Sequence, residues 1–368
     1  MTKEEYWYWL CHIDGLGSVR IRQLLEFFGD AQAIFDASED QVRDSGILPS
    51  RLLETMIQAR KGTAKICRAL EKLVKKQIRF IPVCDPLYPQ KLKEIYDPPC
   101  CLYVKGDARL LSSPCAAIVG ARQCTEYGRQ AAAYFAGILA GMGIAVVSGM
   151  AVGIDAAAHR GALNVGGPTI AVLASDVSTS NPRENLPLYL DISQNGAVIS
   201  EYDDRRTVPG MFPVRNRIIS GMADCVLVME AREKSGSLIT ADQALEQGRE
   251  VFALPGRMDD PFSRGCNALI KSGAQILTGP EDVLSCFAIG EDAVKRGMKT
   301  NGPARREPLT KREAYVYGFV GTDTKHLEQL LEETGLPVSD LLETLLQLEL
   351  KKYVRQPLKN YYSAFHFP

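Results

Sequence analysis

Short apolar runs of strand length alternate with longer helical stretches from about residue 79 to residue 286. Most of the segments between the runs carry apolar residues at helical spacing, as in residues 127–142 and 238–247. Strands that alternate with helices of this length form a mostly parallel sheet covered on both faces. The pattern predicts an α/β fold with an extended Rossmann-like sheet at residues 79–287, with strands at 80–83, 101–104, 116–119, 144–147, 169–173, 197–199, 225–229, 251–254 and 275–277.

The first 78 residues predict a small helical module of the SAM-like or helix-hairpin-helix kind. A glycine turn at residues 13–18 precedes a helical pattern that runs to residue 28. Such a turn offers backbone N–H groups to a DNA phosphate, and Arg20 and Arg22 stand beside it. Many modules of this form only contact a neighbouring domain, and we favour that structural role here.

The chain beyond residue 287 predicts a polar, basic linker at 288–308 and a winged-helix domain at 309–368. The second helix of a helix-turn-helix normally enters the major groove of DNA. Here the polar positions of that helix contain no lysine or arginine: they are Ser339, Asp340, Glu343, Thr344 and Gln347. The basic hairpin with Lys351, Lys352, Arg355 and Lys359 leaves open a contact to a DNA backbone. We nevertheless expect this domain to contact protein rather than to read a DNA sequence.

Composition limits the function classes. The 368 residues suit two or three domains, and a net charge of -1 excludes a protein that is basic all over. A nucleic-acid role thus requires a local cationic groove. The sequence contains no signal peptide and no apolar run long enough to span a bilayer. Its ten cysteines lack metal-ligand spacing, and we expect them to be reduced thiols. We therefore expect a cytoplasmic protein that does not enter a membrane.

Glycines and hydroxyl residues lie beside arginines just before or after the strands at 197–199, 225–229 and 251–254. The carboxyl edge of such a sheet is where open α/β folds bind phosphates. A Ser-Gly-Ser turn before a helical segment leaves backbone N–H groups free for an anion, and glycine lets a phosphate come close. The expected donors of this cluster are Ser235, Gly236, Ser237 and Thr240.

A second cluster contains Arg215, Asn216 and Arg217. The two arginines would point to opposite faces of a strand, but from a loop or a helix start they would converge on one ligand. The alternative for both clusters is structural: the serines cap a helix and the arginines pair with nearby carboxylates. Either explanation suits one cluster alone, whereas the clusters taken together favour a phosphate ligand.

The first crossover of the sheet lacks the dinucleotide fingerprint. After Val119 the chain continues Gly120, Ala121, Arg122, without the G-x-G-x-x-G spacing that fits a pyrophosphate. Arg122 occupies the turn instead, where a guanidinium presents a forked charge to a phosphate. We therefore expect no NAD or FAD and no other cofactor.

The next strand leads into a loop with Gly149 and Gly153 and then into Asp155 and His159, one helical turn apart. A carboxylate beside an imidazole is half of a hydrolytic site. No nucleophile accompanies the pair in the sequence, so we favour a structural role.

These segments together resemble the DNA-processing protein A family, DprA, also called Smf. The segments are Val-Gly-Ala-Arg at 119–122, the Ser-Gly-Met loop with its Asp and His at 148–159, Phe-Pro and Arg-Asn-Arg-Ile-Ile-Ser-Gly at 212–221, Ser-Gly-Ser-Leu-Ile-Thr at 235–240 and Ser-Arg-Gly-Cys-Asn at 263–267. They occur in order across most of residues 80–285, and the flanking modules fit the three-part layout of many members.

The resemblance implies a bacterial protein that binds and protects single-stranded DNA and loads the RecA recombinase during natural transformation. It also implies a homodimer joined through the Rossmann-like domain and no catalytic activity. Carried over from the family, the strand-binding pocket uses Arg122 and Arg183, with Arg215, Asn216 and Arg217 added. The backbone at Gly120 and Gly149 and the hydroxyl cluster complete the expected site.

One stretch departs from the family pattern. Where the family shows an aromatic residue directly before the proline, this chain has Asn181 before Pro182. Aromatic faces stack on the bases of single strands, so the loss weakens base stacking at this point, and Asp176 adds a negative charge near the phosphates. Tyr202 or Phe212 are the residues that would substitute.

A rival function comes from the enzyme class. Related folds occur in the cytokinin-activating phosphoribohydrolases, which use a Pro-Gly-Gly-x-Gly-Thr-x-x-Glu motif with a catalytic glutamate. The corresponding residues 233–242 lack the second glycine and have no glutamate in place. We therefore rank the non-enzymatic mediator first.

Overall fold

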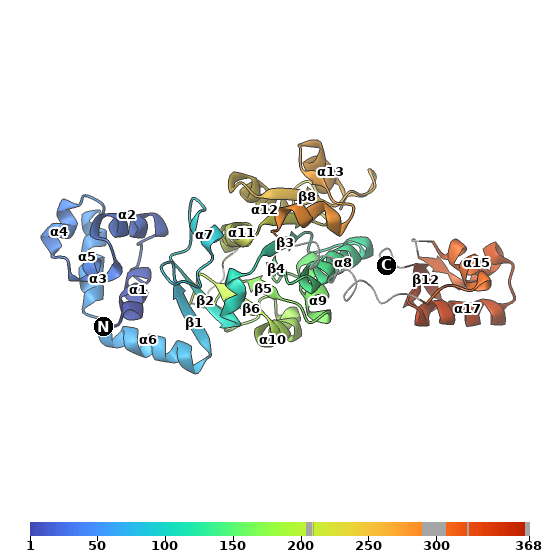
Figure 1. Cartoon of the computed structure of the whole chain (residues 1–368), viewed down its shortest axis with the longest axis horizontal. Coiled ribbons are helices and arrows are strands. Elements are labelled where there is room, and N and C mark those ends of the chain that lie inside the picture. The colour runs from blue at the N-terminus through green and yellow to red at the C-terminus, as the bar shows by residue number, and fades with distance from the viewer. Residues whose placement is uncertain (204–207, 209, 289–306, 322–323, 365–368) are drawn as a thin grey trace.

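The computed structural model describes residues 1–203, 208, 210–288, 307–321 and 324–364. Figure 1 shows a helical module at the N-terminus, a central α/β domain and a winged-helix domain at the opposite end of an elongated molecule. Of the predicted linker at 288–308, only residues 288, 307 and 308 fall within the described chain.

The N-terminal module consists of short helices around Trp7, Leu24 and Met56, which are buried. Its helices are α1 (Lys3–Cys11), α2 (Ser18–Phe28), α3 (Ala31–Asp36), α4 (Glu39–Asp44), α5 (Ser50–Arg60) and α6 (Thr63–Lys75). Side-chain caps begin several of them, as at Thr2, whose hydroxyl accepts from Glu5 N.

The glycine turn between α1 and α2 contacts the central domain. The Ser18 hydroxyl donates to Asp97, and Arg22 Nη1 donates to the Tyr96 carbonyl over 3.3 Å. Because these contacts occupy the start of α2, the structure gives the turn the structural role that the sequence favoured.

The central domain is built on a nine-stranded sheet, and each predicted strand overlaps one of them. The strands lie in the order β1-β2-β6-β5-β4-β3-β7-β8-β9. The pairs β1–β2 and β2–β6 are antiparallel, and every neighbouring pair from β6 to β9 is parallel. The prediction of a mostly parallel Rossmann-like sheet is therefore confirmed. Their bounds are β1 (Ile78–Pro82), β2 (Cys101–Gly106), β3 (Cys115–Val119), β4 (Ala145–Ser148), β5 (Thr169–Val172), β6 (Ala197–Ser200), β7 (Cys225–Val228), β8 (Glu250–Ala253) and β9 (Gln275–Ile276).

Helices cover both faces of the sheet (Figure 1). Alternate residues of β3 point to opposite sides: Ile118 contacts the cluster that includes α8 and α9, and Val119 contacts the one that includes α11 and α12. The helices are α7 (Gln90–Lys93), α8 (Glu126–Gly141), α9 (Ile154–Asn164), α10 (Leu186–Asn195), α11 (Met211–Met222), α12 (Gly236–Glu246) and α13 (Arg264–Lys271), with 3-10 turns η1 (Ala108–Ser112), η2 (Arg183–Asn185) and η3 (Pro280–Cys286). Burial of the central strands on both faces explains their continuous apolar sequences.

The strand order reverses between β3 and β7. From β3 the chain moves outward through β4 and β5 to β6, and then it returns to place β7 on the other side of β3. Loops that leave β3 and β7 therefore diverge at the carboxyl edge. Such a switch point is where open α/β sheets form a ligand crevice.

The C-terminal domain is a winged helix, as predicted. Its elements are α15 (Lys311–Val320), β10 (Lys325–His326), α16 (Leu327–Thr334), α17 (Val338–Leu350), β11 (Val354–Leu358) and β12 (Tyr361–Ala364). The three helices pack around Val316, Leu330 and Leu345. Arg355 of the wing reaches the central domain, where its Nη1 lies 2.5 Å from Glu126 Oε1.

All ten cysteines are free thiols, four of them buried and six half-buried. Across the described residues, no helix combines the length and the apolar character needed to cross a bilayer. The same residues contain no cluster of three or more His, Cys, Asp or Glu side chains that suits a metal ion.

Candidate nucleic-acid interface

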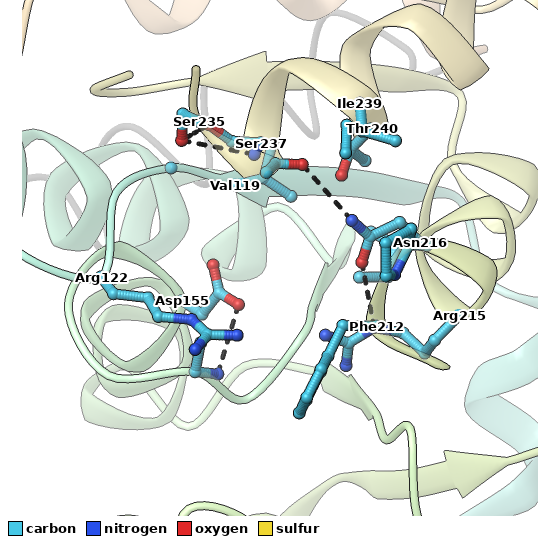
Figure 2. A pocket seen from close by; sticks show the side chains of 15 residues that line it. Val119, Arg122, Asp155, Phe212, Arg215, Asn216, Ser235, Ser237, Ile239 and Thr240 are labelled. Atoms are coloured by element: carbon cyan, nitrogen blue, oxygen red, sulfur yellow. Dashed lines mark hydrogen bonds between the residues drawn. The ribbon is translucent and has the colours of Figure 1, made fainter. Parts of the chain in front are cut away.

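A pocket of about 310 Å³ opens at the switch point between β3 and β7 (Figure 2). The loop after β3, the start of α9, the helix α11 and the N-terminus of α12 form its walls. Apolar and polar side chains are mixed in its lining, which consists of Val119, Gly120, Arg122, Ala151, Asp155, Phe212, Pro213, Arg215, Asn216, Ile219, Ser235, Gly236, Ser237, Ile239 and Thr240.

The N-terminus of α12 forms one wall of this pocket. Ser235 caps the helix by accepting from Ser237 N over 3.4 Å, and the two hydroxyl groups lie 2.8 Å apart. Thr240, one turn further along, is only 1% exposed, and its hydroxyl makes no hydrogen bond to another described residue. The first N–H groups of a helix favour an anion, and Thr240 adds a donor that still lacks a partner.

Arg122 lies at the mouth of the pocket, in the loop after β3. Its side chain is exposed and has no ion pair or hydrogen bond with the described residues. The guanidinium carbon lies 5.2 Å from the centre of the Phe212 ring, and Figure 2 shows both side chains at the pocket. A free guanidinium beside an aromatic face suits both a phosphate and a stacked base.

Arg215 lines the pocket but is almost fully buried. Its Nη1 donates to the Gly149 carbonyl over 2.8 Å and to the Val172 carbonyl, and its Nε donates to Asn216 Oδ1 over 3.1 Å. Burial lowers the pKa of Arg215 to about 10, so the side chain stays charged at neutral pH. Arg215 therefore holds the loop after β4, which contains Gly149, and it also holds the side chain of Asn216. Asn216 Nδ2 in turn donates to the Gly236 carbonyl over 3.4 Å.

Gly149 lies behind the pocket and makes room for this arrangement. A Cβ at this position would come 2.7 Å from Arg215 Nη2 and 2.8 Å from Asp155 Oδ2. We expect Gly149→Ala to lower the free energy of unfolding by about 1–3 kcal/mol through overpacking, measured by urea denaturation. Gly210→Ala is the matched control, because nothing lies within 4 Å of a Cβ there. Equal stability of the two variants would contradict this explanation.

The structure does not bring Arg217 to the pocket. Its guanidinium is committed to two carboxylates, with Nη2 at 2.7 Å from Glu201 Oε2 and Nε at 3.2 Å from Asp97 Oδ2. Burial opposes the charge of Arg217, but both carboxylates raise its pKa. Arg217 thus has the structural role that the sequence left open, which is pairing with nearby carboxylates. We therefore remove it from the proposed strand-binding residues.

Arg183 also lies outside the pocket lining. It is exposed in η2 and has no ion pair with the described residues. Asn185 of the same turn donates to the Met150 carbonyl over 2.8 Å, which fastens this turn to the loop after β4. Arg183 thus remains a proposed contact for a strand that extends beyond the pocket.

The structure places Asp176 outside the pocket lining. Its side chain is buried, and its Oδ1 accepts from Ser178 N over 2.6 Å. Of the two aromatic substitutes, Phe212 lines the pocket, whereas Tyr202 lines a separate cavity beside His12. The sequence did not reveal that Ile219 and Ile239 form an apolar wall of the pocket. Ile219 lies in α11 and Ile239 in α12, and only the fold brings these two helices together.

Asp155 and His159 do not contact each other as a catalytic pair. Asp155 Oδ2 accepts from Ala151 N over 3.2 Å, and burial raises its pKa. His159 Nδ1 lies 2.7 Å from Thr169 Oγ1, which itself donates to the Val146 carbonyl over 2.8 Å. The imidazole therefore donates from Nδ1, and its buried Nε2 has no partner among the described residues.

Burial of His159 predicts an acid-sensitive fold. It lowers the pKa of His159 to about 3, against 6.5 for the free group. Between these values the unfolded chain binds the proton and the folded one does not, so stability present above pH 6.5 is lost as the pH falls. We expect wild type to lose up to about 1.4 kcal/mol per pH unit relative to His159→Gln between pH 6 and pH 5. Parallel stability curves for the two proteins would contradict this.

Comparison with known proteins identifies the family. Residues 79–288 match the family model described as DNA recombination-mediator protein A, and residues 301–357 match the DprA winged helix domain. The chain belongs to the DprA/Smf family. This membership places it among DNA-processing proteins.

Several family members are similar over most of this chain. Protein Smf of Escherichia coli is 38% identical over 281 residues, which covers 75% of this chain and 74% of that protein. The DNA processing protein DprA of Bacillus subtilis is 42% identical over 221 residues, covering 60% and 74% of the two chains.

Solved DprA structures share the fold. The crystal structure of DprA from Streptococcus pneumoniae superposes with a TM-score of 0.69 at 33% identity, over 79% of this chain and 99% of that one. A DprA structure from Helicobacter pylori, described in terms of its single-stranded DNA binding mode, gives a TM-score of 0.52 at 32% identity, over 57% and 94% of the two chains.

Proposed function

We propose that this chain binds and protects single-stranded DNA in the cytoplasm and loads the RecA recombinase onto it during natural transformation. The switch-point pocket carries the proposal. There the N-terminus of α12 favours a phosphate, as do the Thr240 hydroxyl and the Arg122 guanidinium, neither of which has a hydrogen-bond partner among the described residues. The proposed strand-binding set is Gly120, Arg122, Asn216, Ser235, Gly236, Ser237 and Thr240 at the pocket, Gly149 and Arg215 as its support, and Arg183 on the path beyond it.

The shape of the pocket favours a single strand. A volume of about 310 Å³ admits one phosphate with parts of its nucleotide, but a paired duplex is far larger. Phe212 offers an aromatic face, which stacks on a base only where the base is unpaired. Helix α17 carries no lysine or arginine, so this helix does not supply a surface for the major groove of a duplex.

The described pocket does not favour the phosphoribohydrolase alternative. Of its lining residues only Asp155 carries a carboxylate, and this group is buried and accepts a backbone hydrogen bond. General acid or base catalysis requires a carboxyl group that reaches the reacting atoms. The non-enzymatic role is therefore part of the proposal.

Two assays on one preparation test this function. In the first, labelled oligo-dT is bound in the presence of unlabelled duplex of the same length, and we expect the duplex to compete poorly. In the second, release of free base from nucleoside monophosphates is measured, and we expect none. Equal competition by duplex, or base release that Asp155→Asn abolishes, would contradict the proposal.

The RecA-loading part needs its own assay. We propose a homodimer through the Rossmann-like domain, which holds two strand segments and thereby raises the effective concentration of DNA at one place. The expected result is faster RecA strand exchange on DNA already coated by single-strand-binding protein. If strand exchange is no faster with a stoichiometric amount of the dimer, while strand binding is confirmed in the same buffer, the protein binds single strands but does not load RecA.

A truncation separates the winged helix from strand binding. Because the pocket residues all lie before residue 288, we expect a fragment of residues 1–287 to bind oligo-dT within about threefold of the full chain, as for a change under 1 kcal/mol. Fluorescence anisotropy at one salt concentration measures both proteins. A loss of most of the affinity would mean that the wing contacts the strand.

A further inference from the structure

Helix α17 of the winged-helix domain has two apolar faces. Leu341, Leu345 and Leu348 are buried in the domain core. A second set of apolar residues follows at every fourth position and is 39–68% exposed: Val338, Leu342, Leu346 and Leu350. We call these four residues the α17 stripe.

The stripe is continuous along the helix. Residues four apart are displaced by roughly 40° around an α-helix, so the four side chains form one slanting row along the length of α17. Figure 1 shows α17 along an outer edge of the winged-helix domain. Exposed apolar residues are ordinary when scattered, whereas a contiguous row on one helix is typical of an interaction surface.

The charged residues of α17 itself are all acidic. Glu343 and Glu349 lie three residues before and after Leu346 and so border the row, and both are exposed without an ion pair to the described residues. Asp340 is different, because Arg312 Nη2 lies 3.2 Å from its Oδ2. Among the described residues, the carboxylates of α17 that lack an ion pair are therefore Glu343 and Glu349.

This combination excludes two occupants on electrostatic grounds. A DNA backbone would face uncompensated carboxylates on a helix that has no cation of its own. A second copy of α17, packed antiparallel, would bury the apolar row but would bring no lysine or arginine of its own helix to Glu343 or Glu349. A partner that buries the row must supply the positive charge.

We propose that the α17 stripe docks a basic amphipathic helix of a partner protein. The apolar face of that helix packs along Leu342 and Leu346, and its lysines or arginines pair with Glu343 and Glu349. This is the helix-on-surface mode of recognition, in which apolar anchors at helical spacing give affinity and the flanking charges give orientation. The recognition helix of the winged-helix domain thus serves protein contact.

A synthetic helical peptide tests the surface on the full chain. The probe is a fluorescent peptide of about 14 residues that contains only leucine and lysine, with leucines at helical spacing. We expect saturable binding that the double variant Leu342→Ala/Leu346→Ala weakens about tenfold, since two exposed anchors lose their apolar contact. Alanine keeps the helix intact at these exposed positions.

Matched controls isolate the charge. Glu343→Gln/Glu349→Gln should weaken binding about threefold and flatten its salt dependence, whereas Glu332→Gln on α16, an exposed glutamate of the same domain, should change neither. A peptide of leucine and glutamate should not bind.

Four outcomes would overturn the proposal. They are the absence of peptide binding, unchanged binding by the leucine variant, equal binding of the acidic peptide, and a fall in oligomeric mass or in duplex affinity on Leu342→Ala/Leu346→Ala. A fall in mass by sedimentation would assign the surface to a second copy, and a fall in duplex affinity would assign it to DNA.

Discussion

Replacing Arg215 by methionine should lower the free energy of unfolding by about 3–5 kcal/mol, because it removes the cation beside the buried Asp155 carboxylate and leaves that carboxylate unpaired. The buried Asp155 carboxylate would lose its neighbouring cation, and the carbonyl groups of Gly149 and Val172 would lose a donor. Denaturant unfolding of Arg215→Met against wild type measures the loss. Strand binding should fall as well, since Asn216 and the β4 loop would lose their support.

Arg122→Met is the matched control for this prediction. Arg122 lines the same pocket but is exposed and unpaired among the described residues, so its replacement should change stability by no more than about 0.5 kcal/mol. If Arg215→Met kept wild-type stability while it abolished strand binding, Arg215 would contact the strand directly and the supporting role would be wrong.

Strand affinity should fall steeply with salt, and Arg122 should account for part of that dependence. A single strand that makes about three to five phosphate contacts, one in the pocket and the others along the path beyond it, gives a slope of about -2 to -3.5 in log affinity against log salt. Raising the salt from about 50 to about 200 mM should then weaken binding roughly 20- to 130-fold. Arg122→Ala should lower affinity at every salt concentration and reduce the slope by about 0.7.

Arg109→Ala is the control for the salt series. This arginine is exposed in η1, just before β3 and hence at the opposite edge of the sheet, where it pairs with Asp107 at 2.8 Å. Its removal should leave both affinity and slope unchanged. An equal slope for wild type and Arg122→Ala would show that Arg122 does not meet a phosphate.

The sheet could be predicted from the sequence because each strand carries its own signal. Strands buried on both faces are continuous apolar runs, and β3, β4 and β5 each appear as such a run between helical stretches. The position of the pocket followed from the same pattern, because the carboxyl ends of parallel strands meet at one edge.

The roles of the two arginines in α11 could not be predicted. Arg215 and Arg217 are two residues apart, yet one supports the pocket and the other is held by Glu201 and Asp97. These partners lie 16 and 120 residues away in the chain, and no local pattern reports contacts across such separations. The alternatives left open by the sequence were decided by tertiary packing.

Asp176 shows the same limit in a loop. The sequence places its charge near the expected phosphates, but the fold turns the side chain inward to accept the Ser178 N–H. An aspartate that bonds the backbone two residues ahead is a common turn device. Its local bonding therefore explains the residue better than its charge does.

Amide hydrogen exchange on the full chain, with and without oligo-dT, tests most directly that the switch-point pocket binds the strand. We predict slower exchange in the loop after β3 at residues 120–122 and at the start of α12 at residues 236–240, because a bound phosphate engages the N–H groups of a helix start. Residues 338–358 of the winged helix should exchange at the same rate in both samples. Protection confined to the winged helix or to the N-terminal turn at 13–18, with the pocket segments unchanged, would contradict strand binding at the pocket.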